Sequence, residues 1–164
     1  MTEAVATVRR VGPDDWTALR AIRLESLADT PEAYGSTLAD VVASPDEHWH
    51  LMVARGASFL AELDGRVVGM VAGGTHNEQP GTRWMYGMYV SPDARGTGVA
   101  DHLVNTVSRW ARDEGVVQLY LSVTSTLARA RAFYERMGFR PTGATTSMLR
   151  DPSITLVTMV RDLD

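Results

Sequence analysis

The chain has no cysteine among its 164 residues. This absence excludes disulfide bonds, thiolate metal sites and cysteine nucleophiles. The sequence also lacks any run that approaches the roughly 20 apolar residues of a membrane-spanning helix. Its N-terminus, MTEAVATVRR, has no apolar segment of signal-peptide length. We therefore expect a cytoplasmic protein with no membrane partner.

Basic residues are scattered and form no continuous patch. The chain carries 16 basic and 20 acidic residues, for a formal net charge of −4. Because general nucleic-acid binding needs clustered cations to neutralise phosphates, no nucleic-acid partner is expected. The sequence shows no internal repeat, linker or low-complexity segment. Its length and its composition, 45% apolar and 22% charged, predict a single domain over residues 1–164.

Helical spacing of apolar residues dominates the N-terminal third. Residues 4–11 alternate weakly and end at Gly12-Pro13, which predicts an edge strand. Pro13 and two acidic residues open a helix predicted over 14–29, which ends before Pro31. A turn over 31–37 leads to a second short helix, and Ser44-Pro45 predicts a third that ends near residue 55.

After Gly56 the apolar period shortens to two or gives way to continuous apolar runs, which indicates strands. Asp64-Gly65 predicts a hairpin turn, and the polar segment 76–82 is expected to join the hairpin to a third strand. Strands and helices then alternate, so the order predicts an α/β (α+β) fold with a mixed sheet and helices on both faces. The predicted strands are 58–63, 66–75, 83–90, 116–123, 139–143 and 154–160, and the predicted helices are 99–114 and 127–137.

A glycine loop lies between the strand predicted over 83–90 and the helix predicted over 99–114. Gly96 and Gly98 stand at the start of that helix, where several backbone N–H groups lack intrahelical partners and the helix dipole is positive. Glycine adopts positive φ without a Cβ penalty and lets an anion approach the main chain closely. With Arg95 adding a positive charge at its rim, the loop predicts a phosphate-binding site.

Two separated motifs resemble the GCN5-related N-acetyltransferase (GNAT) superfamily. Its acyl-CoA signature is Arg or Gln, two residues, Gly, one residue, and Gly or Ala; the matching residues are Arg95, Gly98 and Ala100, after a strand that ends in Val90-x-Pro92. The second motif, A-x-x-x-Y-x-x-x-G-F, is matched by Ala130, Tyr134, Gly138 and Phe139. Residues 23–37 also resemble the two-helix N-terminal segment of many bacterial members, so the similarity spans nearly the whole chain.

The resemblance implies a mostly antiparallel sheet of six to seven strands and an enzyme that transfers an acetyl group from acetyl-CoA to a primary amine by direct attack. In this family the loop amides hold the diphosphate of the cofactor, and its pantetheine arm lies along the preceding strand. Gly87 stands where the family often has a bulge, which would free an N–H to polarise the thioester carbonyl. The cofactor-binding residues implied are Met88, Tyr89, Val90, Arg95, Gly96, Thr97, Gly98, Val99 and Ala100.

The resemblance makes Tyr134 the general acid, a phenol that protonates the departing CoA thiolate. The structural alternative is an aromatic side chain on a core-facing helical stripe. Leu127 stands where the family commonly has an Asn that binds the pantetheine arm, so that contact is expected from Thr124, Ser125 or Thr126.

Ser122 stands where many members have a Glu as general base. Deprotonation of the amine then runs either through a water chain to Glu62, Tyr86 or His76, or in solution before binding. Tyr34 is expected to form one wall of the acceptor channel. The strand side chains Trp84, Met85, Tyr86, Met88 and Tyr89 either line that channel or pack in the core.

Two other functions stay open at this point. A non-catalytic acyl-CoA sensor or interaction module on the same fold is favoured by Leu127 and Ser122. A dinucleotide-binding fold is disfavoured because the third glycine of its motif is absent. His48 and His50 are two residues apart on different sides of a helix, so no metal is expected. The acceptor is a small-molecule or peptide amine, and similar proteins commonly form homodimers.

Overall fold

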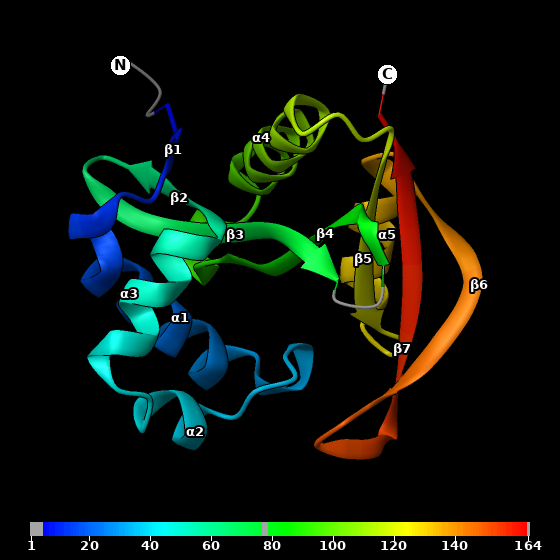
Figure 1. Cartoon of the computed structure of the whole chain (residues 1–164), viewed down its shortest axis with the longest axis horizontal. Helices are drawn as coiled ribbons and strands as arrows, with labels where there is room; N and C mark the ends of the chain where they lie inside the picture. Colours follow the sequence, from blue (N-terminus) through cyan, green and yellow to red (C-terminus); the bar gives the residue numbers. More distant parts are fainter. Residues whose placement is uncertain (1–4, 77–78, 164) are drawn as a thin grey trace.

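A seven-stranded sheet forms the centre of the computed structural model, which describes residues 5–76 and 79–163 (Figure 1). The strand order is β1-β2-β3-β4-β5-β7-β6. β4 and β5 run parallel, and the other neighbouring pairs run antiparallel, which confirms the predicted mixed, mostly antiparallel sheet. The strands are β1 (Thr7–Arg10), β2 (Ala57–Leu63), β3 (Arg66–His76), β4 (Gln79–Val90), β5 (Gln118–Thr124), β6 (Phe139–Met148) and β7 (Asp151–Asp162).

Helices cover both faces of the sheet, as predicted. Figure 1 shows α4 above the sheet and the three N-terminal helices below it. Successive strand residues face opposite sides, so Phe59 packs in the core with α4 and α5, whereas Leu60 packs in the core with α1 and α3. The helices are α1 (Trp16–Asp29), α2 (Leu38–Val42), α3 (Asp46–Arg55), α4 (Val99–Asp113) and α5 (Ala128–Arg136), with 3-10 turns at Pro13–Asp15, Pro31–Ala33 and Pro92–Ala94.

The β2–β3 hairpin has the predicted turn, since Asp64 and Gly65 both have positive φ (53° and 77°). The predicted joining segment over 76–82 is wrong for residues 79–82, because β4 begins at Gln79 and His76 pairs with Gln79. β6 and β7 also extend beyond the predicted 139–143 and 154–160. Main-chain hydrogen bonds form these ends, and their polar, exposed side chains give no apolar alternation to read.

β4 and β5 separate towards their C-terminal ends, and this separation positions the site. Their register pairs are Arg83 with Leu119 and Trp84 with Tyr120. Four residues of β4, from Tyr86 to Tyr89, then oppose three of β3, from Met70 to Ala72, and Gly87 has a φ of 59°. The bulge expected at Gly87 is therefore present, and it bends β4 where its β5 edge becomes unpaired.

Candidate active site

The glycine loop presents a row of free backbone N–H groups. Gly96 and Gly98 have φ values of 79° and 87°, and Gly98 caps the start of α4 without a side-chain hydrogen bond. In the described chain, the amides of residues 96–100 donate to no carbonyl. A hollow of about 290 Å³ lies against the loop, lined by both glycines, Ala100 and Arg136. This arrangement can hold an anionic group on main-chain donors.

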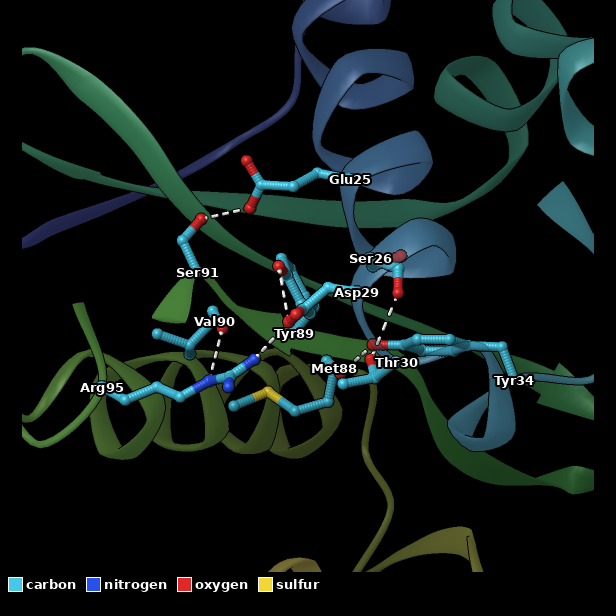
Figure 2. A network of polar contacts seen from close by, with 10 residues as sticks. All are labelled: Glu25, Ser26, Asp29, Thr30, Tyr34, Met88, Tyr89, Val90, Ser91 and Arg95. Carbon is cyan, nitrogen blue, oxygen red and sulfur yellow. Dashed lines mark hydrogen bonds and ion pairs between the residues drawn. The ribbon is translucent and has the colours of Figure 1, made fainter. Parts of the chain in front are cut away.

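Arg95 does not stand free at the rim of the loop. Its Nε donates to the Val90 carbonyl (3.0 Å), and its Nη2 lies 2.7 Å from Asp29 Oδ2 at the end of α1. Figure 2 shows the side chain running towards α1, where the Tyr89 hydroxyl also donates to Asp29 (3.2 Å). Since a neighbouring carboxylate already neutralises its charge, Arg95 braces the loop against α1.

β4 exposes an open edge beside the loop. The Ser91 N–H donates to Val68 on β3, so the main-chain groups of the preceding residue, Val90, face away from β3. On that open side the Val90 carbonyl accepts from Arg95, and the Met88 carbonyl accepts from the Tyr34 hydroxyl (2.9 Å; Figure 2). Each carbonyl keeps a second lone pair for a ligand amide.

Two cavities meet beside this edge. A groove of about 700 Å³ runs between β4 and α5 and adjoins the glycine-loop hollow, with which it shares Val90, Arg95, Ala100 and Phe133. A second cavity of about 310 Å³, here called the acceptor pocket, lies beyond the groove. The groove and the acceptor pocket share Ala33, Tyr34, Met88, Leu127, Ala130 and Tyr134. Tyr34, the predicted wall of the acceptor channel, therefore lines both cavities.

Tyr134 lies where the groove and the acceptor pocket meet. Helix α5 holds it on the core-facing stripe that also carries Ala130, and the ring packs edge-on against Phe139. No described residue hydrogen-bonds its hydroxyl. Burial, followed by the nearby Tyr34, raises the pKa of Tyr134 above its ordinary value. The phenol therefore keeps its proton at neutral pH, and no described residue accepts that proton in a hydrogen bond.

The free energy of unfolding is expected to fall as pH rises above about 10. An unfolded tyrosine loses its proton near that pH, whereas the raised pKa keeps folded Tyr134 protonated, so its stabilisation is present below about pH 10 and is lost above it. Tyr134→Phe should remove up to about 1.4 kcal/mol of this decline per pH unit. Urea unfolding between about pH 8 and 11 measures it, with Tyr120→Phe as the matched control; an unchanged slope in Tyr134→Phe would contradict it.

Leu127 has no side-chain amide for a ligand, and its neighbours show which residue can supply a polar contact in its place. The Thr124 hydroxyl donates to the Glu32 carbonyl (3.0 Å), and the Ser125 carbonyl accepts from Arg131 (3.1 Å). Thr126 lines the groove, so of the three predicted substitutes it is the one available to a ligand there.

The structure places the residues predicted to help remove a proton from the amine at different distances from the acceptor pocket. Ser122 and Tyr86 line the acceptor pocket, and the Tyr86 hydroxyl donates weakly to Thr75 (3.4 Å). Glu62 does not line that pocket, and its carboxylate accepts a 2.9 Å hydrogen bond from Arg9 on β1, so the structure does not bring Glu62 to the site. The side chain of His76 lies outside the described residues.

Sequence reasoning missed three residues of the site. Arg150, in the turn between β6 and β7, donates to the carbonyls of Pro31 and Tyr34 (both 2.9 Å) across 116 residues of sequence from Tyr34. It clamps the turn that carries Tyr34. Arg23 lines the acceptor pocket, and its guanidinium stacks 4.7 Å from the centre of the Tyr34 ring. Trp49, also missed, lines a smaller cavity beside Arg23. No local pattern marks any of the three, because each acts through long-range contacts.

The described residues contain neither a metal-binding cluster nor a membrane-spanning helix. No group of three or more His, Cys, Asp or Glu side chains is placed to hold a metal ion. No helix in the described part of the chain has both the length and the apolar character to cross a bilayer.

Known proteins resemble this chain in sequence and in fold. The acetyltransferase (GNAT) family model matches residues 18–139. N-acetyltransferase family 8 member 2 of Rattus norvegicus is 35% identical over 109 residues, which are 65% of this chain and 46% of that protein. Mycothiol acetyltransferase of Thermomonospora curvata is 32% identical over 134 residues, 81% of this chain and 43% of that protein. The chain thus spans less than half the length of these relatives.

Solved structures share the whole fold. Ribosomal-protein-alanine N-acetyltransferase from Brucella melitensis superposes with a TM-score of 0.77 at 24% identity, covering 96% of this chain and 99% of that one. The yncA acetyltransferase from Salmonella typhimurium, solved with its cofactor acetyl-CoA, superposes with a TM-score of 0.78 at 22% identity, covering 98% and 95%. Since the family match covers most of the sequence and the sheet has the fold of these structures, the chain belongs to the acetyltransferase (GNAT) family.

Proposed function

We propose that this protein transfers an acetyl group from acetyl-CoA to the primary amine of a small molecule or peptide. The observation that carries the proposal is the junction at Tyr134. There, a groove that leads from the free amides of the glycine loop meets a separate pocket. A two-substrate transfer needs both cavities, with a proton donor between them.

The residues present fit coenzyme A. The amides of residues 96–100 offer donors without competing acceptors, which suits a diphosphate. Arg129 lines the groove and makes no ion pair with a described residue, so it adds a free positive charge. The open edge of β4 at Met88 and Val90 suits the amides of a pantetheine arm. When bound, acetyl-CoA supplies an acyl group as a thioester.

The chain supplies the proton and the charge stabilisation for this transfer. The bulge at Gly87 leaves the N–H of Met88, on the open edge of β4, to polarise the carbonyl oxygen. Tyr134 donates its phenolic proton to the departing sulfur as the new N–C bond forms and the C–S bond breaks. The amine loses one proton in the transfer, and Tyr134 regains its own from solvent.

The proton that the amine loses goes to water. No Asp, Glu or His is among the described residues that line the acceptor pocket. The Ser122 hydroxyl faces that pocket without a described hydrogen-bond partner, so it can order a water molecule there. The enzyme therefore depends on the small fraction of acceptor that is already a neutral amine, and turnover should rise with pH until the acceptor amine is deprotonated.

A thiol-release screen tests this function. Purified protein with acetyl-CoA is offered aliphatic amines, aromatic amines, amino acids and peptides, and released CoA is measured with a thiol reagent. The chain contains neither cysteine nor lysine, so it contributes no thiol signal and no lysine side chain as a competing acceptor. We expect thermal stabilisation by CoA and release of CoA with at least one class of amine. Thermal stabilisation by CoA without CoA release from any class of amine would favour the non-catalytic sensor. If the protein shows neither stabilisation nor release, CoA binding itself is rejected.

A further inference from the structure

Among the described residues, two buried side-chain donors lack hydrogen-bond partners, and both belong to residues that line the same small cavity. They are the Nη1 of Arg23 on α1 and the Nε1 of Trp49 on α3. Trp49 is only 1% exposed. Both residues line a cavity of about 140 Å³ between these helices and β3. Leaving buried donors unpaired costs free energy, so the cavity calls for a hydrogen-bond acceptor.

This small cavity adjoins the acceptor pocket. The two share Arg23, Tyr86 and Gly87 among their lining residues. At Gly87 a side-chain Cβ would meet no atom within 4 Å, so the bulge leaves open space. Tyr86, 41% exposed, stands at the same place. A molecule whose amine lies near Tyr134 can therefore extend past Gly87 towards Arg23 and Trp49.

The cavity carries a positive charge that no described carboxylate neutralises. Arg23 makes no ion pair with the described residues, and its guanidinium contacts the Tyr34 ring instead. The carboxylates further along α1 have other partners: Glu25 accepts from Ser91 (2.5 Å) and Asp29 pairs with Arg95 (2.7 Å; Figure 2). Burial lowers the pKa of Arg23, the direction expected for a cation without a counter-ion.

We propose that the acceptor amine also carries a carboxylate, which binds to the guanidinium of Arg23 and the indole N–H of Trp49. This inference rests on the proposed acetyl transfer and narrows its substrate class. A planar carboxylate matches a guanidinium in two parallel hydrogen bonds and supplies the missing negative charge. Since Arg23 and Gly87 line both cavities, the amine of one small molecule can lie in the acceptor pocket while its carboxylate reaches Arg23.

The walls of the acceptor pocket define the rest of the molecule. Apart from Arg23 and the groups near Tyr134, its lining is largely apolar and aromatic, and the pocket volume of about 310 Å³ admits a small molecule. The acceptor class is therefore a hydrophobic α-amino acid or a compound of that shape. The apolar residues that line the pocket include Trp84, Met85, Leu121, Met148 and Leu156.

Paired acids and amides test this proposal. L-leucine, L-methionine and L-phenylalanine are compared with their carboxamides, both as acceptors for acetyl-CoA and as ligands of the CoA-bound protein by calorimetry. We expect kcat/KM for the preferred acid to exceed that for its amide by about 100-fold, as for loss of a paired charged hydrogen bond. The amine of the carboxamide is less basic than that of the acid, so more of the carboxamide is in the reactive neutral form. Amine basicity alone would therefore make the carboxamide the better acceptor.

Arg23→Gln should bring the acid-to-amide ratio close to one by raising the KM of the acid, with the KM of acetyl-CoA unchanged. Trp49→Phe should lower the ratio about 10-fold. Arg23→Lys keeps the charge and should keep part of the preference, which guards against a variant that fails to fold. Arg20→Gln, on the same helix but outside the lining of both cavities, is the matched control and should keep the full ratio.

The outcomes separate this inference from the function on which it rests. Equal use of acids and amides by the parent enzyme would overturn the inference and leave acetyl transfer standing, as would a ratio that Arg23→Gln does not change. If no amine releases CoA, acetyl transfer fails, and calorimetry still decides whether carboxylates bind. If neither acids nor amides bind, the two donors are satisfied by ordered water alone and the proposal is rejected.

Discussion

Tyr134→Phe is expected to lower kcat by about 100-fold or more while leaving the Kd for CoA unchanged. The raised pKa keeps the phenol protonated, and its position between groove and acceptor pocket suits proton donation to a departing thiolate. Because no described residue hydrogen-bonds the hydroxyl, removing it leaves no protein group unpaired. The variant should therefore fold as the parent does below about pH 10, where the tyrosine is neutral in both states.

The matched control for this change is Tyr120→Phe. Tyr120 stacks on Trp84 and donates its hydroxyl to Gln118 (3.1 Å), outside the lining of both cavities. Steady-state kinetics and calorimetry with CoA on both variants give the comparison. If Tyr134→Phe retains full kcat with an active acceptor, then Tyr134 is a core aromatic and the leaving thiolate takes its proton from water.

Gly98→Ala is expected to weaken CoA binding by about 10- to 100-fold. Gly98 has a φ of 87° and lines the hollow beside the free amides, so an added methyl strains the backbone and occupies the anion site. The strain alone should cost about 1–2 kcal/mol of folding free energy. Calorimetry with CoA separates the loss of binding from the loss of stability measured by urea unfolding.

Gly115→Ala provides a control at the other end of the same helix. Gly115 follows α4, has a φ of 84°, and has no atom within 4 Å of a would-be Cβ, as is true of Gly98. The two variants should lose similar stability, and only Gly98→Ala should lose CoA affinity. Equal Kd values for CoA in both variants would show that the loop at 95–100 does not hold the cofactor.

Local chemistry explains why so much of the site could be predicted. Gly65 in the hairpin turn and Gly96 and Gly98 in the loop have positive φ. Glycine at each of these positions marks the turn and the loop in the sequence. The spacing of Ala130 and Tyr134 places both on one face of α5, whatever the helix packs against. Such features depend on neighbours within a few residues, which the sequence displays directly.

Side-chain partners from distant elements could not be predicted in the same way. Arg95 looked like a free cation beside the loop, but the packing of α1 brings Asp29 within 2.7 Å of it. Glu62 looked available as a base, but strand pairing places it on Arg9 of β1. Both ion pairs join elements that are distant in sequence, so they depend on how the helices and strands pack in three dimensions.

The sequence by itself determined the order of elements, the glycine loop, the tyrosine on α5 and, through its motifs, the family. Only the tertiary structure decided that β7 lies between β5 and β6, that Arg150 clamps the Tyr34 turn, and that Arg23 and Trp49 border one cavity. The physical reason is the sequence separation of the interacting residues. Backbone conformation follows from adjacent residues, whereas burial, pairing and cavity shape follow from contacts that join residues far apart in the chain.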